Sequence, residues 1–355
     1  MGPIARTMRL GIDGGVFPGG VVLVRHRNEI VFHEAYGHSV THQDAHTVSA
    51  HPVRTRRETV YDLASITKLF TATCVMRLVD EEHIRLDDPV ASHLPGFAVN
   101  GKADVTVRQL LAHVAGLPYE RLWETAPTPE ARRQRVLAIK PEGPAGTSYV
   151  YHDTNFIVLG MLIEQVDGHP LDRAIAARIL RPLGLDQTGY GPPGASTPGV
   201  AATEDESYVG RGMVWGEAHD ENAWSLGGVA GHAGLFGSAR DLSIFGQAYL
   251  NGGAFGAFML LKPDTVAEMT RNQIGRLGSR GLGWQLNAPH YMGSLASPET
   301  YGHTGFTGTS IVVDPRRDLV VVLLTNRVHP TRHGRDVNPT RQAVANAVLA
   351  AADAA

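Results

Sequence analysis

The chain has 355 residues, a formal net charge of −3 and one cysteine, and 43% of its residues are hydrophobic. This composition is typical of a globular protein with two domains or one large one, and it excludes a disordered or fibrous chain. The small net charge gives no support for nucleic acid or an anionic membrane as a partner. A single cysteine excludes an internal disulfide and a cysteine-based zinc site.

The sequence contains no run of ~18 apolar residues, so we expect no membrane span. The first twenty residues lack the apolar run of a secretory signal. We therefore expect the chain as given to be cytoplasmic, or periplasmic or extracellular if a signal has been removed. The oligomeric state does not follow from the sequence.

Apolar and turn-forming residues predict the following elements in chain order. Residues 20–37 read as two strands around a polar turn at 26–29, and 38–60 as a surface loop. A largely buried helix of about five turns follows from residue 62. Further helices are expected at 106–114, 127–139, 154–181, 239–250, 263–272 and 338–353, and strands at 309–313 and 319–325.

Strands at both ends of the chain with helices between them suggest one sheet built from the two termini and a helical insertion. We therefore expect residues 1–75 together with 206–355 to form an α/β domain. Residues 76–205 would form a mainly helical domain, with the active site between the two.

Ser65 and Lys68 form the first candidate constellation, Ser-Ile-Thr-Lys. On a helix, positions i and i+3 share a face, so the Lys68 amine can reach the Ser65 hydroxyl. A lysine desolvated on an apolar helix can have a lowered pKa and act as the base that a serine nucleophile needs. The alternative is a capping serine followed by an ordinary surface-reaching lysine. Only four of the 32 basic residues are lysines, which favours a special role for Lys68.

Two further motifs gain weight beside the first. Tyr151-His152-Asp153 follows a turn and could present a tyrosine hydroxyl as a proton shuttle. Its alternative is an aromatic residue packed at a helix start with Asp153 as the cap. The stretch 303–309, His-Thr-Gly-Phe-Thr-Gly-Thr, lies before a strand and could line a site with backbone N–H groups. Its alternative is a plain glycine-rich turn.

Other chemistries have no motif in this sequence. No G-x-G-x-x-G follows a predicted strand, and the sequence holds neither a Walker A motif nor H-E-x-x-H. We therefore expect neither a cofactor nor a metal ion.

Together, the three motifs resemble those of the serine β-lactamase and penicillin-binding-protein superfamily, whose S-x-x-K and K-T-G elements they match in order. The tyrosine-centred motif is similar to that of the class C β-lactamase branch, which includes D-alanyl-D-alanine peptidases and family VIII esterases. The resemblance extends through most of the chain and includes 62–68, 86–90, 231–236 and 302–309.

This resemblance implies an α/β (α+β) fold of the β-lactamase/transpeptidase type, with an antiparallel sheet flanked by helices and an all-helical domain. It implies that Ser65 is acylated, that Lys68 accepts its proton and that Tyr151 exchanges a proton with the leaving group. The oxyanion would be bound by the N–H groups of Ser65 and Phe306.

Two positions depart from the family pattern. Asp153 stands where the family usually has Asn, and an ionised Asp cannot donate a hydrogen bond to a substrate carbonyl. His303 begins the triplet His303-Thr304-Gly305 where the family usually has Lys, and histidine is only partly charged near neutrality. Both changes weaken the recognition of β-lactams.

The sequence therefore favours a serine hydrolase of small carboxylic esters with weak or no β-lactamase activity. The first alternative keeps the same machinery for cell-wall peptides or β-lactams, as a D,D-carboxypeptidase, a muropeptide amidase or a β-lactamase. The second alternative, from another class, is a non-catalytic sensor. In the catalytic readings the partner is a small-molecule ester, amide or β-lactam substrate.

Overall fold

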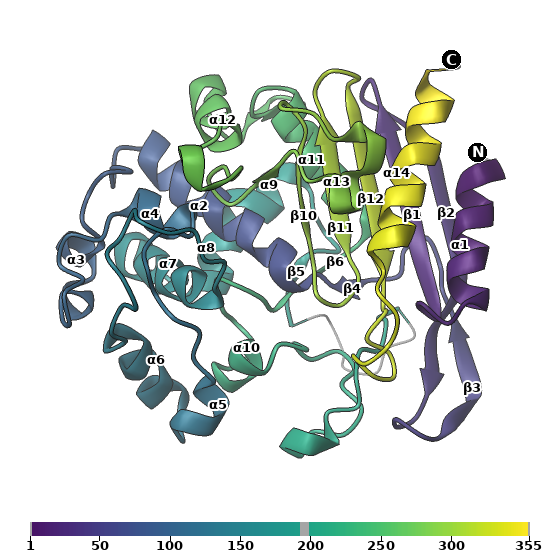
Figure 1. Ribbon diagram of the computed structural model, residues 1–355, viewed down its shortest axis with the longest axis horizontal. Helices are drawn as coiled ribbons and strands as arrows, with labels where there is room; N and C mark the ends of the chain where they lie inside the picture. Colours follow the sequence, from purple (N-terminus) through teal and green to yellow (C-terminus); the bar gives the residue numbers. More distant parts are fainter. Residues whose placement is uncertain (1, 192–198, 354–355) are drawn as a thin grey trace.

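A large antiparallel sheet dominates the computed structural model, which describes residues 2–191 and 199–353. The sheet has seven strands in the order β3-β2-β1-β12-β11-β10-β9 (Figure 1). Its strands are β1 (Gly19–His26), β2 (Glu29–His42), β3 (Val48–Arg54), β9 (Gln285–Leu286), β10 (Tyr301–Thr304), β11 (Ser310–Asp314) and β12 (Leu319–Thr325).

Helices cover both faces of the sheet and form a separate group beside it (Figure 1). Short strands pair outside the main sheet: β4 (Tyr61–Asp62), β5 (Gly189–Tyr190) and β6 (Leu235–Gly237) in one group, β7 (Ala254–Phe255) and β8 (Phe258–Met259) in another. The α-helices are α1 (Gly2–Asp13), α2 (Thr67–Asp80), α3 (Val90–His93), α4 (Val107–Leu111), α5 (Leu122–Thr125), α6 (Pro129–Leu137), α7 (Asp153–Asp167), α8 (Leu171–Ile175), α9 (Arg181–Leu183), α10 (Glu221–Ser225), α11 (Ala239–Leu250), α12 (Pro263–Thr270), α13 (Pro289–Met292) and α14 (Asn338–Ala352).

The central strands are apolar on both faces because each face packs against helices. Along β1, Val21 and Leu23 belong to a buried cluster that includes residues of α2, α7 and α11. Val22 and Val24 point the other way, into a second cluster with residues of α1 and α14. Successive side chains of a strand alternate between faces, so a continuous apolar run marks a strand buried on both sides.

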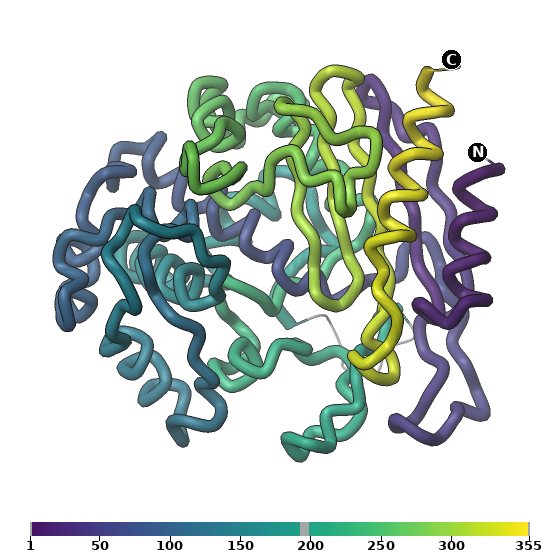
Figure 2. The backbone as a smooth tube through the Cα atoms, in the orientation of Figure 1, coloured from purple at the N-terminus to yellow at the C-terminus, as the bar shows by residue number. Residues whose placement is uncertain are grey.

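The two ends of the chain meet at this sheet. β1 pairs with all of β12, from Gly20 opposite Thr325 to His26 opposite Leu319. α1 and α14 lie side by side on one face, as the tube trace in Figure 2 also shows. The expected sheet built from both termini is therefore confirmed.

Two expected elements were wrong. Residues 38–60 are not a loop, because β2 continues to His42 and β3 pairs with it as the edge strand. Polar side chains suit an edge strand that faces water, and this polarity hid the strand. The expected helix 154–181 is broken: α7 ends at Asp167, and Gly168 takes a left-handed conformation with φ +75° before Pro170.

The antiparallel sheet flanked by helices confirms the expected fold class. The division into a domain of residues 1–75 with 206–355 and a domain of residues 76–205 stays a prediction. In the part of the chain that the structure describes, none of the helices is both long and apolar enough to traverse a bilayer.

Candidate active site

Ser65 lies in a tight turn that its neighbours hold under strain. The turn is a single 3-10 segment, Ala64–Ile66, which leads directly into α2. Ala64 has φ +47°, a conformation that costs a residue with a Cβ about 1 kcal/mol or more. The buried carboxylate of Asp62 fixes it, because one oxygen accepts the Ala64 N–H at 2.7 Å and the other accepts the His219 N–H at 2.7 Å.

Lys68, on the first turn of α2, connects the nucleophile to the second motif. Its side chain is fully buried, and its Nζ donates a hydrogen bond to Ser65 Oγ at 2.9 Å. The same Nζ lies 2.7 Å from Asp153 Oδ1 and donates to the His232 carbonyl at 3.1 Å. The i, i+3 contact expected from the sequence is therefore present, together with two partners from distant segments.

The protonation state of Lys68 differs from the expected one. Burial lowers the pKa of Lys68, but the carboxylate of Asp153 and the phenol of Tyr151 outweigh burial and raise this pKa above its usual value. The sequence predicted a lowered pKa because it could not show that Asp153 would touch the amine. Lys68 is therefore an ammonium near neutral pH and donates to Ser65 in the resting protein.

The ring of Tyr151 has two cations, Lys68 and Arg280, and the ring of His113 as close neighbours. Lys68 Nζ lies 5.0 Å from the centre of the tyrosine ring, and the Arg280 guanidinium lies 5.2 Å from it. The His113 ring is 4.5 Å away. Burial, then the charges of Arg280 and Lys68, hold the pKa of His113 well below its usual value, so it adds no third charge.

His303 is neutral, and a buried arginine stands behind it. The ring is 1% exposed, and burial, then the charges of Arg280 and Lys68, lower its pKa well below the usual value. Arg280 Nη2 donates to His303 Nε2 at 3.1 Å, and His303 Nδ1 donates to the Thr304 carbonyl at 2.8 Å. His303 lies on β10, a short strand that the sequence did not predict, and the stretch 303–309 precedes β11 as expected.

The turn after β10 is fastened to the segment that carries Ser65. Thr307 Oγ1 donates to the Asp62 carbonyl at 2.8 Å, and Thr309 Oγ1 donates to the Leu63 carbonyl at 3.1 Å. Gly305 packs so closely that a Cβ there would lie 2.6 Å from the Leu63 oxygen. Only glycine fits at such a distance, so this turn and the Ser65 turn form two walls of one site.

The expected oxyanion donors are both available. In the described part of the chain, the backbone N–H groups of Ser65 and Phe306 donate no hydrogen bond. Phe306 is 48% exposed, and its ring packs on the guanidinium of Arg327 at 4.6 Å. Two unbonded N–H groups at adjoining turns suit a developing oxyanion.

Ser65 opens into a polar cleft of about 640 Å³. Its lining includes the candidates Ser65 and Tyr151 together with two arginines and the start of α14. The cleft is lined by Ser65, Tyr149, Tyr151, Gln285, His303, Thr304, Gly305, Phe306, Arg327, Gly334, Asp336, Val337, Asn338 and Arg341.

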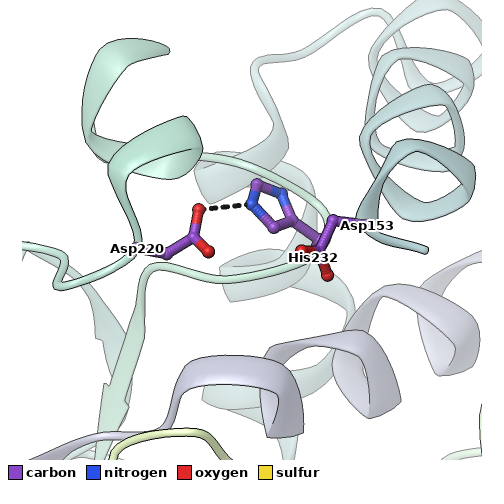
Figure 3. Close-up of side chains that lie close together, drawn as sticks. All are labelled: Asp153, Asp220 and His232. Atoms are coloured by element: carbon purple, nitrogen blue, oxygen red, sulfur yellow. Dashed lines mark hydrogen bonds and ion pairs between the residues drawn. The ribbon is translucent and has the colours of Figure 1, made fainter. Parts of the chain in front are cut away.

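Beside Lys68, Asp153 belongs to a cluster with Asp220 and His232 (Figure 3). His232 Nε2 donates to Asp220 Oδ1 at 2.7 Å, and the Asp220 side chain is 29% exposed. Carboxylate and imidazole atoms within 4.8 Å of one another could bind a cation. Here the Lys68 ammonium, 2.7 Å from Asp153, already provides one.

A second buried cluster packs against Phe306 in the wall of the cleft. Glu204, Glu206 and His219 gather behind Phe306, and the His219 ring stacks on the Phe306 ring at 5.7 Å. Arg211 pairs with Glu206 at 2.7 Å. Burial raises the pKa of Glu206 to about 7, although His219 and Arg211 oppose the rise.

The structure thus brings the sequence-predicted residues Ser65, Lys68, Tyr151, Asp153 and His303 to one place. Sequence reasoning missed Arg280, Asp220 and His113, which lie in loops that carry no motif of their own. His232 lies in the stretch 231–236 that resembles the family, but the sequence did not indicate its contact with Asp220.

Comparisons with known proteins identify relatives of this chain. A sequence model of the family described as Beta-lactamase matches residues 4–346. A putative D-alanyl-D-alanine carboxypeptidase of Salmonella enteritidis PT4 is 36% identical, over 92% of this chain and 83% of its own.

Two solved structures share the fold. A penicillin-binding protein homologue from Caulobacter crescentus superimposes with a TM-score of 0.75 at 23% identity, covering 98% of this chain and 96% of its own. EstCE1, described as a hydrolase with promiscuous acyltransferase activity, gives 0.75 at 24% identity, covering 97% and 98%.

Proposed function

Because this chain belongs to the beta-lactamase family, whose members are serine hydrolases, we propose that it forms an acyl-enzyme at Ser65 and releases a leaving group that carries a carboxylate. The substrate class is a peptide ending in D-alanine, so the activity is that of a D,D-carboxypeptidase. The name of the 36% identical relative supports this class.

The cleft is the observation that carries the proposal. Arg327 lines the same cleft as Ser65 and is half-buried there, while its Nε is held by the Phe306 carbonyl at 2.9 Å. A guanidinium binds a carboxylate through parallel hydrogen bonds. A cleft lined mainly by polar side chains suits a peptide terminus better than an acyl chain.

The first half of the reaction follows from the contacts of Ser65. Lys68, once it has lost a proton and become a free amine, accepts the Ser65 proton as Oγ attacks the substrate carbonyl carbon. The N–H groups of Ser65 and Phe306 stabilise the negative charge on the carbonyl oxygen. Tyr151 gives its proton to the leaving amine and takes one from the Lys68 ammonium, so the proton count balances.

The second half repeats these steps with water in place of the leaving amine. Water attacks the acyl carbon, and its proton passes through Tyr151 to Lys68. The Lys68 ammonium then returns a proton to Ser65 Oγ as the ester bond breaks.

A small carboxylic ester remains the second candidate substrate. The neutral state of His303 favours it, because the position that carries a lysine in relatives of this type adds no charge here. Slow β-lactam hydrolysis is expected for the same reason.

The test compares the wild type with Ser65→Ala, and with Ser92→Ala as a control at an exposed serine outside the cleft. Each protein receives a peptide ending in D-Ala-D-Ala, a short p-nitrophenyl ester and nitrocefin, with mass spectrometry for a covalent adduct. We expect release of D-alanine that is lost only in Ser65→Ala. Ester turnover without D-alanine release would favour the esterase. Binding without turnover or adduct would contradict the hydrolase and favour a sensor.

A further inference from the structure

Arg341, on the first turn of α14, is a buried cation whose hydrogen-bond partners are uncharged oxygens, two of them backbone carbonyls. It is 7% exposed, and its Nη2 donates to the Gly305 oxygen at 2.9 Å and to the Thr309 oxygen at 2.8 Å. Its Nη1 donates to Asn338 Oδ1 at 2.8 Å. Among the described residues, no carboxylate lies within ion-pair distance of this guanidinium.

This arginine keeps its charge in the working range of pH. Burial, then the neighbouring charge of Arg327, lowers the pKa of Arg341 to about 10. The guanidinium is therefore a cation at neutral pH, and its charge faces the carbonyl oxygen of Gly305. Burying a charge without an acidic partner costs free energy of folding. A role in function would account for an arginine at this position.

The peptide unit that Arg341 holds is the one that carries the expected oxyanion donor. The Gly305 carbonyl and the Phe306 N–H belong to the same trans peptide, in which the two groups point in opposite directions. A carbonyl fixed toward Arg341 therefore turns the Phe306 N–H away from α14. Gly305 also packs against Leu63 and Ala64, next to Ser65.

We infer that Arg341 positions and polarises the Gly305–Phe306 peptide so that its N–H meets the oxyanion formed at Ser65. A cation on the carbonyl draws electron density from the amide and makes its N–H a stronger donor. Arg341 is thus a positioning residue that acts through the backbone. The inference rests on the proposed acyl-enzyme chemistry.

Arg341 also lines the cleft, so the rival role is direct binding of a substrate carboxylate. The two roles predict different kinetics. Loss of oxyanion stabilisation lowers kcat for every substrate, whereas loss of a carboxylate contact raises KM and only for substrates that have a carboxylate.

The test uses Arg341→Met and Arg341→Lys with two substrates, a p-nitrophenyl acetate that lacks a carboxylate and a peptide ending in D-Ala-D-Ala. Arg327→Met is the matched control, because Arg327 lines the same cleft and bonds the next carbonyl, that of Phe306. An aryl boronic acid, which forms a tetrahedral adduct with a serine, reports on the oxyanion site without turnover.

We expect Arg341→Met to lower kcat about 10- to 100-fold for both substrates, below the 10²–10³ lost when a donor is removed outright. KM should stay within about twofold. Boronic acid affinity should fall by a similar factor, and Arg341→Lys should recover part of each loss. Arg327→Met should raise KM for the peptide alone.

The fold should survive, because the Gly308 N–H also bonds the Gly305 oxygen at 3.1 Å. Circular dichroism checks this, and Asn338→Ala, which removes one support of the guanidinium, gives a milder variant if Arg341→Met does not fold. If Arg341→Met only raised KM for the peptide, or left kcat unchanged for both substrates, this inference alone would be overturned. A wild type with no turnover and no Ser65 adduct would overturn the proposed function and this inference together.

Discussion

Lys68 has three polar contacts and no exposure to water, so its charge state decides what Ser65 can do. The ion pair with Asp153 stabilises the ammonium form. A serine hydroxyl cannot transfer its proton to an ammonium, and catalysis must therefore wait for the small fraction of free amine. We therefore expect the pair to limit the activity at neutral pH.

Asp153→Asn tests the pair. Removing the carboxylate lowers the pKa of Lys68, so the rise of kcat/KM with pH should move to lower pH and activity at pH 7 should increase, by about tenfold per pKa unit. The wild type should still gain activity as pH rises above 9. The measurement is a pH profile of kcat/KM with the best substrate of the paired assay.

Asp220→Asn is the matched control for that profile. Asp220 belongs to the same cluster, but it bonds His232 rather than the Lys68 amine. Its replacement should shift the profile less than Asp153→Asn does. Equal shifts in both variants, or a lower activity of Asp153→Asn at every pH, would contradict the role given to the ion pair.

At the scale of residues, the sequence could predict what local spacing determines. Ser65 and Lys68 are three positions apart, and their contact follows from helix geometry. Arg280 contacts Tyr151 and His303 from a loop that has no regular pattern, so only the folded chain shows it. The predicted lowering of the Lys68 pKa was wrong for the same reason, because Asp153, whose carboxylate raises this pKa, is distant in sequence.

At the scale of elements, buried strands were easier to predict than edge strands. β12 matches its expected bounds, because a short run of six apolar residues rich in valine, followed by Thr325, is typical of a buried strand. β3 was missed because it contains Pro52 and lies within a polar segment, and β10 because it is only four residues long. Short elements at the site depend on their neighbours more than on their own sequence.

The segment around Glu206 should make stability depend on pH. The folded-state pKa of Glu206 is raised to about 7 from 4.5, so its contribution is present below pH 4.5 and is lost as pH rises through 7. Wild-type Tm should therefore fall between pH 5 and pH 8 by roughly 2–4 °C more than the Tm of Glu206→Gln. Thermal melts monitored by circular dichroism measure this.

Glu58→Gln provides the control for the melts, since Glu58 is exposed on the surface. Its pH dependence should match that of the wild type. If Glu206→Gln retains the full wild-type dependence, another group is responsible for it.

At the scale of the whole molecule, the centre of the sheet is the best protected region. β1, β12 and β11 lie between two helical layers, whereas β3 is an edge strand with mostly exposed side chains. Opening the centre requires the core on both faces to separate, so its amides exchange only through the largest unfolding events.

Hydrogen exchange followed by mass spectrometry can check this order. Peptides covering Val21–Val24 and Val320–Leu324 should exchange slowest, and peptides covering Val48–Arg54 should be among the fastest. Comparable rates at the centre and at the β3 edge would contradict the described layering.

The pairing of β1 with β12 also has a consequence for synthesis on the ribosome. More than 280 residues must be made after β1 before its partner β12 exists. Until then, the apolar edge of β1 in the nascent chain has only β2 beside it and can pair with other chains. A chaperone that shields this early hairpin should therefore raise the yield of native protein more than one that acts after release.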